Sequence, residues 1–198
     1  MNEALKKHIT DGIETHKKLI GQLQESGLDM LAAIAQAIEK VVKQDGRVYI
    51  CGNGGSAADA QHIAAELVGR FERERKPLPA IALTTDTSLI TSIANDYDFA
   101  DVFVKQVEAL VRESDILWVI STSGTSPNVV AAAELAKQKR ACVLAFTGKS
   151  DSKLEQLADI CFCANSESTA RSQEIHQVAY HIICDLVERS FCEQPKQK

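Results

Sequence analysis

Apolar residues recur along this chain at two different spacings, and the two patterns alternate. The clearest unit spans residues 47–71. A short β-branched and aromatic run ends at Cys51, a glycine-rich turn follows, and apolar residues then recur at helical intervals as far as Phe71. A continuous apolar run at 116–120 is typical of a central parallel strand. The predicted strands are Arg47–Cys51, Ala80–Thr84, Ile116–Ile120, Cys142–Phe146 and Ile160–Cys163.

Helical spacing separates these strands throughout. Strand and helix in alternation indicate one parallel sheet covered on both faces by right-handed crossovers. We therefore expect an α/β fold, a single doubly wound five-stranded parallel sheet. Two helices precede the first strand and cannot be crossovers, so we expect an N-terminal helical hairpin that packs on the sheet or on another subunit. The predicted helices cover about 3–24, 28–43, 57–71, 87–94, 99–111, 127–139 and 169–191.

No linker, internal repeat or low-complexity stretch divides the chain. We expect a single domain, with N-terminal helices in 1–45, an α/β core in 46–192 and a disordered tail in 193–198. The net charge of −5, without a basic cluster, argues against non-specific nucleic-acid binding. No run is apolar enough to span a membrane, residues 1–20 lack a signal-peptide segment, and the six scattered cysteines suggest reduced thiols in the cytosol.

Two polar loops follow predicted strands. In open parallel sheets, ligands bind beyond the carboxyl ends of the strands, where such loops lie. The first, 52–56, is rich in glycine, so its backbone N–H groups can face an anion. The second, 121–127, offers five hydroxyls, and Pro127 suits a first helical turn with Ser126 as its N-cap. An ordinary capped turn explains Ser126 and Pro127 but not the other hydroxyls. This composition favours a phosphate-monoester site.

Other phosphate motifs fit less well. A P-loop needs a lysine after its second glycine, and neither loop contains one. The glycines at 52 and 54 with Ala57 match a dinucleotide fingerprint formally, but the acidic residue that should end the second strand falls instead in a charged turn at 71–74. We therefore set NAD aside.

Two predicted helices carry polar stripes. His62 and Glu66 stand one turn apart and could bind a metal or share a proton. An exposed helix pair is the commoner explanation, and Arg70 could pair with Glu66 on the surface. The last helix carries Gln173, Gln177 and His181 opposite its apolar face, whereas His176 is better explained by packing or surface exposure. Whether the two stripes meet is a question of tertiary structure.

Four motifs in order resemble the phosphoheptose isomerases, also called sedoheptulose 7-phosphate isomerases, of the sugar-isomerase (SIS) domain superfamily. The similarity covers about residues 47–190, and the usual loop sequence STSGNS differs only by Thr125 in place of asparagine. The resemblance implies a flavodoxin-like fold and a cytosolic homotetramer that makes D-glycero-D-manno-heptose 7-phosphate for surface polysaccharides. The motifs are CGNGGSAADAQHIAAEL, LTTDTSLITSIANDY, ISTSGTSPNVV and RSQEIHQVAYHIICDL.

By the same resemblance, one zinc ion per subunit would be held by His62, Glu66, Gln173 and His181. Glu66 and His181 would also form the acid–base pair. Gln173 and His181 are about 12 Å apart along a regular helix, so both reach one metal only if Gln173 lies at a frayed helix start or the ligands come from different subunits. The sugar phosphate would be bound by Asn53, Gly54, Gly55, Asn95, Asp96, Ser121, Thr122, Ser123 and Ser126, with Gln173.

Two alternatives use the same fold. Non-catalytic SIS-domain adaptors that bind a replication-initiator-type protein lack the glutamate equivalent to Glu66, which this chain retains. Sugar-phosphate-sensing regulators usually carry a DNA-binding domain, for which 198 residues leave no room. The resemblance therefore favours an isomerase that moves a proton through an enediol, with Glu66 as the base.

Overall fold

The computed structural model describes residues 2–192, and its centre is one sheet of five strands. Every neighbouring pair of strands runs parallel. The expected doubly wound α/β fold is thus confirmed. The strands lie in the order β2-β1-β3-β4-β5 and span β1 (Val48–Gly52), β2 (Ala80–Ala82), β3 (Ile116–Ser121), β4 (Cys142–Thr147) and β5 (Ile160–Cys163).

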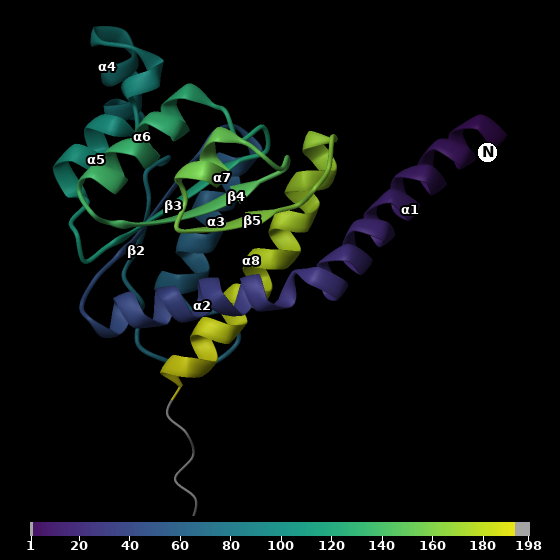
Figure 1. Cartoon of the computed structure of the whole chain (residues 1–198), viewed down its shortest axis with the longest axis horizontal. Coiled ribbons are helices and arrows are strands. Elements are labelled where there is room, and N and C mark those ends of the chain that lie inside the picture. Colours follow the sequence, from purple (N-terminus) through teal and green to yellow (C-terminus); the bar gives the residue numbers. More distant parts are fainter. Residues whose placement is uncertain (1, 193–198) are drawn as a thin grey trace, which may run out of the picture.

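Helices cover both faces of this sheet, with α2, α3 and α8 on one side and α5, α6 and α7 on the other (Figure 1). Alternate residues of each strand face opposite layers: Ile50 joins the first core and Tyr49 the second. No described helix meets the length and apolarity that a bilayer crossing needs. The helices are α1 (Glu3–Ser26), α2 (Leu28–Lys43), α3 (Gly55–Val68), α4 (Thr87–Asp96), α5 (Val104–Leu110), α6 (Pro127–Gln138), α7 (Lys153–Leu157) and α8 (Thr169–Phe191).

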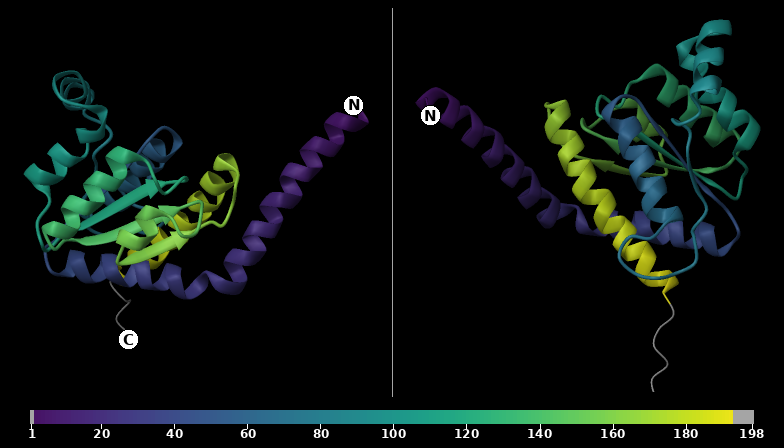
Figure 2. Two further views of the ribbon diagram at one scale, coloured as in Figure 1. Left: turned by 45° about the horizontal axis from the view of Figure 1, so that its top comes forward. Right: turned by 180° about the vertical axis from the view of Figure 1, so that it is seen from behind.

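The two N-terminal helices are present, but they do not fold back on each other as a hairpin. Only Gly27 separates them, and its backbone stays in the right-handed helical region (φ −97°, ψ −14°). A hairpin needs a longer connection in which the chain reverses. The chain bends instead: α2 lies across the body against α8, while α1 extends away from it (Figure 2).

Several element boundaries differ from the predicted ones. The predicted helix 99–111 divides into a 3₁₀ turn (Phe99–Asp101) and α5, and the helix after the glycine turn ends at Val68, before Phe71. Helix α7 was not predicted, because five residues are too few for helical periodicity to show. The predicted tail, 193–198, lies outside the described residues.

The strand order positions the site. From β1 the chain crosses to β2 on one side, and β3 lies on the other side of β1. The connections that leave β1 and β3 therefore diverge, which opens a crevice beyond the carboxyl ends of these two strands. Both polar loops follow those strands.

Candidate functional site

A cleft of about 300 Å³ occupies that crevice. It lies between the loops that follow β1 and β3, and the first turns of α8 form its third wall. Neither lysine nor arginine is among its lining residues, so an anion here would be held by hydroxyls, amides and helix N-termini. The lining consists of Asn53, Gly54, Gly55, Ser56, Ile120, Ser121, Thr122, Ser126, Thr169 and Gln173.

The glycine loop is shaped for close approach. Gly54 has φ +55°, a conformation that L side chains rarely adopt. A Cβ on Gly55 would lie 2.3 Å from Nε2 of Gln173, so only glycine lets the α8 side chain come this near to the start of α3. Asn53 is oriented by two reciprocal hydrogen bonds with Asn128, of 2.8 and 2.9 Å between amide nitrogen and oxygen.

In the loop that follows β3, the hydroxyl side chains lie within hydrogen-bonding distance of one another. The Ser121 hydroxyl is 2.9 Å from the Ser126 hydroxyl and 3.2 Å from that of Ser123, and the backbone N–H of Thr125 donates to Ser123. Ser126 stands at the N-cap of α6 with Pro127 in the first turn, as predicted, but its hydroxyl makes no capping bond. Ser126 lines the cleft instead, and its hydroxyl pairs with that of Ser121.

The two polar stripes do meet. Helices α3 and α8 pack side by side (Figure 2), and His62, Glu66 and His181 each offer one ligand atom within 4.8 Å of the others. His62 Nε2 is 3.0 Å from Glu66 Oε1 and 3.4 Å from His181 Nε2. Burial and the neighbouring His62 lower the pKa of His181, although Glu66 acts to raise it. Both imidazoles and the carboxylate are partly exposed, so a ligand can reach them.

These donors fit a zinc ion. Catalytic zinc is held by imidazole nitrogens and carboxylate oxygens, commonly three protein ligands with one position left open. Arg70 pairs with Glu74 and leaves the Glu66 carboxylate free for this cluster. The Glu66 backbone oxygen accepts a hydrogen bond from Arg75 (2.7 Å), which holds the last turn of α3.

Gln173 is separated from this cluster within one chain. Helix α8 is regular from Thr169, so Gln173 is not at a frayed start, and eight residues place it about 12 Å from His181 along the axis. It lines the cleft instead. His62 likewise lies about 10 Å along α3 from Gly55. The cleft and the cluster are thus two ends of one α3–α8 surface.

Asn95 and Asp96 lie elsewhere. Both are exposed on α4, which projects from the body (Figure 1), and the Asn95 amide donates to the Asp96 carboxylate at 2.8 Å. Neither residue lines the cleft of the same chain. Their predicted contact with substrate therefore stays a prediction that would need a second subunit.

Two residues beside the cluster were not foreseen. Asp59 precedes His62 by one turn of α3, and burial raises the pKa of its carboxyl to about 6, against the opposing effects of His62 and Tyr180. The Tyr180 hydroxyl is 2.9 Å from His62 Nδ1. The spacing of Asp59 and His62 could have indicated a shared face, but Tyr180 fits the apolar pattern of α8, so the sequence carries no signal for it.

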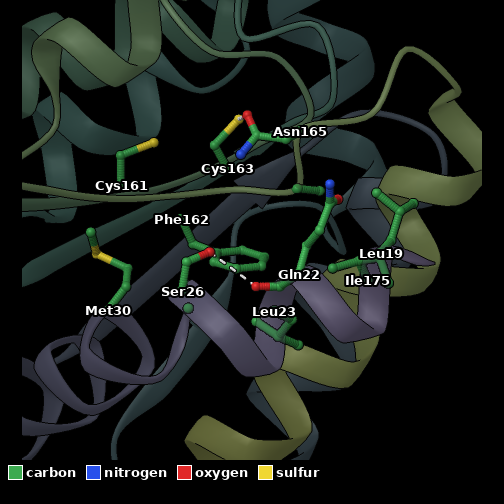
Figure 3. Close-up of a pocket in the computed structure, with 12 residues that line it drawn as sticks. Leu19, Gln22, Leu23, Ser26, Met30, Cys161, Phe162, Cys163, Asn165 and Ile175 are labelled. Atoms are coloured by element: carbon green, nitrogen blue, oxygen red, sulfur yellow. Dashed lines mark hydrogen bonds between the residues drawn. The ribbon is translucent and has the colours of Figure 1, made fainter. Parts of the chain in front are cut away.

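A second hollow, of about 180 Å³, lies where α1 joins the body (Figure 3). Leu19 and Leu23 of α1 face Phe162 of β5 across it. The Cys163 thiol donates to the Asn165 side chain there. None of the described residues around it carries a carboxylate, an imidazole or a basic group. We therefore attribute the side chains that line this hollow to the packing of α1 against the body rather than to a reaction site.

Known proteins are similar to this chain in sequence and in fold. The SIS domain family model matches residues 13–148. A phosphoheptose isomerase from Roseiflexus is 45% identical over 98% of each chain, and one from Azoarcus is 51% identical over 80% of this chain and 84% of its own. The structure of a phosphoheptose isomerase from Francisella tularensis superposes with a TM-score of 0.89 at 38% identity, covering 96% of this chain and all of the other. The chain belongs to the phosphoheptose isomerase family of SIS-domain proteins.

Proposed function

We propose that this protein is an aldose–ketose isomerase that converts sedoheptulose 7-phosphate to D-glycero-D-manno-heptose 7-phosphate. The observation that carries the proposal is the meeting of His62, Glu66 and His181 on the surface that also leads to the hydroxyl-lined cleft. The named relatives support the substrate, because they match nearly the whole chain.

Each end of the site would have its own task. The cleft would bind the phosphate through its hydroxyls and helix N-termini, far enough from the cluster to leave the reacting carbons beside Glu66. Its proposed ligands are the lining residues Asn53, Gly54, Gly55, Ser121, Thr122, Ser126 and Gln173, with Ser123 supporting Ser121 and with Asn95 and Asp96 from a neighbouring subunit.

Glu66 would take the proton from the carbon next to the carbonyl. His181 would be the second acid–base group, which moves a proton between the two oxygens or returns one to carbon. A zinc ion held by His62, Glu66 and His181 would supply Lewis-acid polarisation of the carbonyl. Burial and the neighbouring His62 lower the pKa of His181, which favours the neutral imidazole that can ligate a metal.

The assembly belongs to the same proposal. We infer a single-domain chain that forms a cytoplasmic homotetramer. Exposed apolar residues on α1, on α4 and directly after α4 support self-association: Leu5, Ile9, Ile13, Leu89, Tyr97 and Phe99. A second copy is also the route by which a Gln173 side chain could join the cluster as a ligand.

The decisive experiment mixes purified protein with sedoheptulose 7-phosphate, with and without a chelator. We expect turnover that Glu66→Gln lowers by about 10²–10⁴-fold, because this variant keeps the shape but loses the base. Glu74→Gln makes the same charge change at an exposed position and should behave as wild type. Wild-type turnover in Glu66→Gln would remove Glu66 from the mechanism, and a folded but inactive wild type would favour the adaptor alternative.

A further inference from the structure

We propose that Tyr180 and Asp59 form a hydrogen-bond relay that holds His62 in the tautomer able to ligate a metal through Nε2. The relay runs from His62 Nδ1–H to the Tyr180 oxygen, and from the Tyr180 hydroxyl proton to the Asp59 carboxylate. This inference rests on the metal centre proposed above and adds two positioning residues to it.

The two ring nitrogens of His62 face different partners. Nε2 points at the cluster, 3.0 Å from Glu66 Oε1 and 3.4 Å from His181 Nε2, while Nδ1 is 2.9 Å from the Tyr180 hydroxyl. A neutral imidazole carries its proton on one nitrogen and a lone pair on the other. If the lone pair of Nε2 faces the cluster, Nδ1 carries the proton and the tyrosine oxygen must accept it.

Asp59 is suited to complete the relay. A hydroxyl that accepts from His62 still has its own proton to donate. The Tyr180 hydroxyl lies close enough to Asp59 to lower the pKa of its carboxyl, and the buried Oδ2 of Asp59 has no hydrogen-bond partner among the described residues, so this oxygen is free to accept the tyrosine proton. A buried acceptor left unpaired costs stability, so a tyrosine proton directed at Asp59 lowers the free energy of this arrangement.

The opposite tautomer keeps the contacts of His62 with Glu66 and Tyr180, but it leaves Asp59 unpaired and offers no lone pair to a metal. In that form Nε2–H donates to Glu66, the tyrosine donates to Nδ1, and no lone pair of His62 faces the cluster. Asp59 then receives no proton from Tyr180. Partners of this kind, which bond the far nitrogen of a ligating histidine, fix both ring orientation and tautomer in metal sites. Tyr180 itself is held firmly, since it is only 1% exposed.

The test removes single atoms. Tyr180→Phe keeps the ring and loses the hydroxyl, and zinc affinity is measured by competition with a chromophoric chelator. We expect zinc binding weakened by about 10–100-fold. Tyr49→Phe is the matched control, because Tyr49 is equally buried and its hydroxyl donates to the Leu110 backbone oxygen (3.3 Å) in the other core layer. It should bind zinc as wild type does.

A second variant and a direct readout separate positioning from general damage. Asp59→Asn keeps an acceptor for the tyrosine proton and should retain most of the zinc affinity, whereas Asp59→Leu should lose as much as Tyr180→Phe. Nitrogen-15 NMR of the metal-free protein reports the tautomer, with the His62 signal assigned through His62→Gln. We expect Nδ1–H in the wild type and a shift toward Nε2–H in Tyr180→Phe.

The outcomes distinguish the relay from the metal centre. Tyr180→Phe with unchanged zinc affinity and an unchanged His62 tautomer would overturn the relay and leave the metal centre intact. A wild-type protein that does not bind zinc at all would overturn the metal centre, and the relay with it.

Discussion

Single side chains decide the chemistry of this site, and the histidines illustrate how. His62 and His181 are partly exposed and lie against a carboxylate, whereas His176, on the same helix as His181, is fully buried. His176 Nε2 donates to the Thr147 backbone oxygen (2.9 Å), and its Nδ1 has no partner among the described residues. Burial and neighbouring groups thus separate these three histidines: His62 and His181 belong to the candidate metal cluster, and His176 belongs to the core.

Burial of His176 predicts acid sensitivity. Burial lowers the pKa of its imidazole to about 4, although the bond to Thr147 opposes the shift. The unfolded chain binds a proton near pH 6.5 and the folded one only near pH 4, so stability falls as pH falls through this window, by about 3 kcal/mol in total.

We expect His176→Gln to be less stable than wild type at pH 7 but to lose less stability between pH 6.5 and pH 4.5. Urea unfolding midpoints with a chelator present would measure this. Parallel pH profiles for the two proteins would contradict the assignment.

At the scale of elements, the loop after α3 is tied to α8 by a buried carboxylate. Glu188 accepts hydrogen bonds from the backbone N–H groups of Phe71, Glu72 and Arg73, all at 2.8 Å. Burial alone would raise the pKa of Glu188, but these bonds and the nearby Arg75 outweigh it and hold the pKa below its usual value. Since Arg75 also donates a hydrogen bond to the Glu66 backbone oxygen, this tie supports the turn of α3 that carries Glu66.

Glu188→Gln should therefore destabilise the fold by about 3 kcal/mol. The NH₂ group of the new amide would be a hydrogen-bond donor that faces the backbone N–H donors of the loop. Denaturant unfolding at pH 7 measures the change. Glu74→Gln, which breaks only an exposed ion pair with Arg70, should alter stability by less than about 0.5 kcal/mol. Equal midpoints for the two variants would show that the buried tie does not stabilise the loop.

At the scale of the whole molecule, the extended α1 is unusual for a lone subunit. It leaves the body as a long arm (Figure 2), and its outer half exposes Leu5, Ile9 and Ile13 at 59%, 53% and 51%. These residues repeat every fourth position and form one stripe. Such a stripe is expected to be covered by another copy of the chain.

Ile9→Lys should weaken the assembly, because it places a charge in that stripe. Light scattering after size-exclusion chromatography should give four times 21.6 kDa for wild type and a smaller mass for the variant. Thr10→Lys adds the same charge at the next, exposed position of α1, away from the stripe, and should keep the wild-type mass. Unchanged mass for Ile9→Lys would rule out the stripe as an interface.

The sequence by itself determined the five strands, the crossover helices other than α7 and the two polar loops, because periodicity and turn composition act over a few neighbouring residues. It also placed His62 and Glu66 on one face of α3. Only the tertiary structure decided that His181 joins them, that Gln173 lies at the cleft, and that Tyr180 lies against His62. Those contacts depend on how α3 and α8 pack, and residues more than a hundred positions apart carry no local pattern that records their distance.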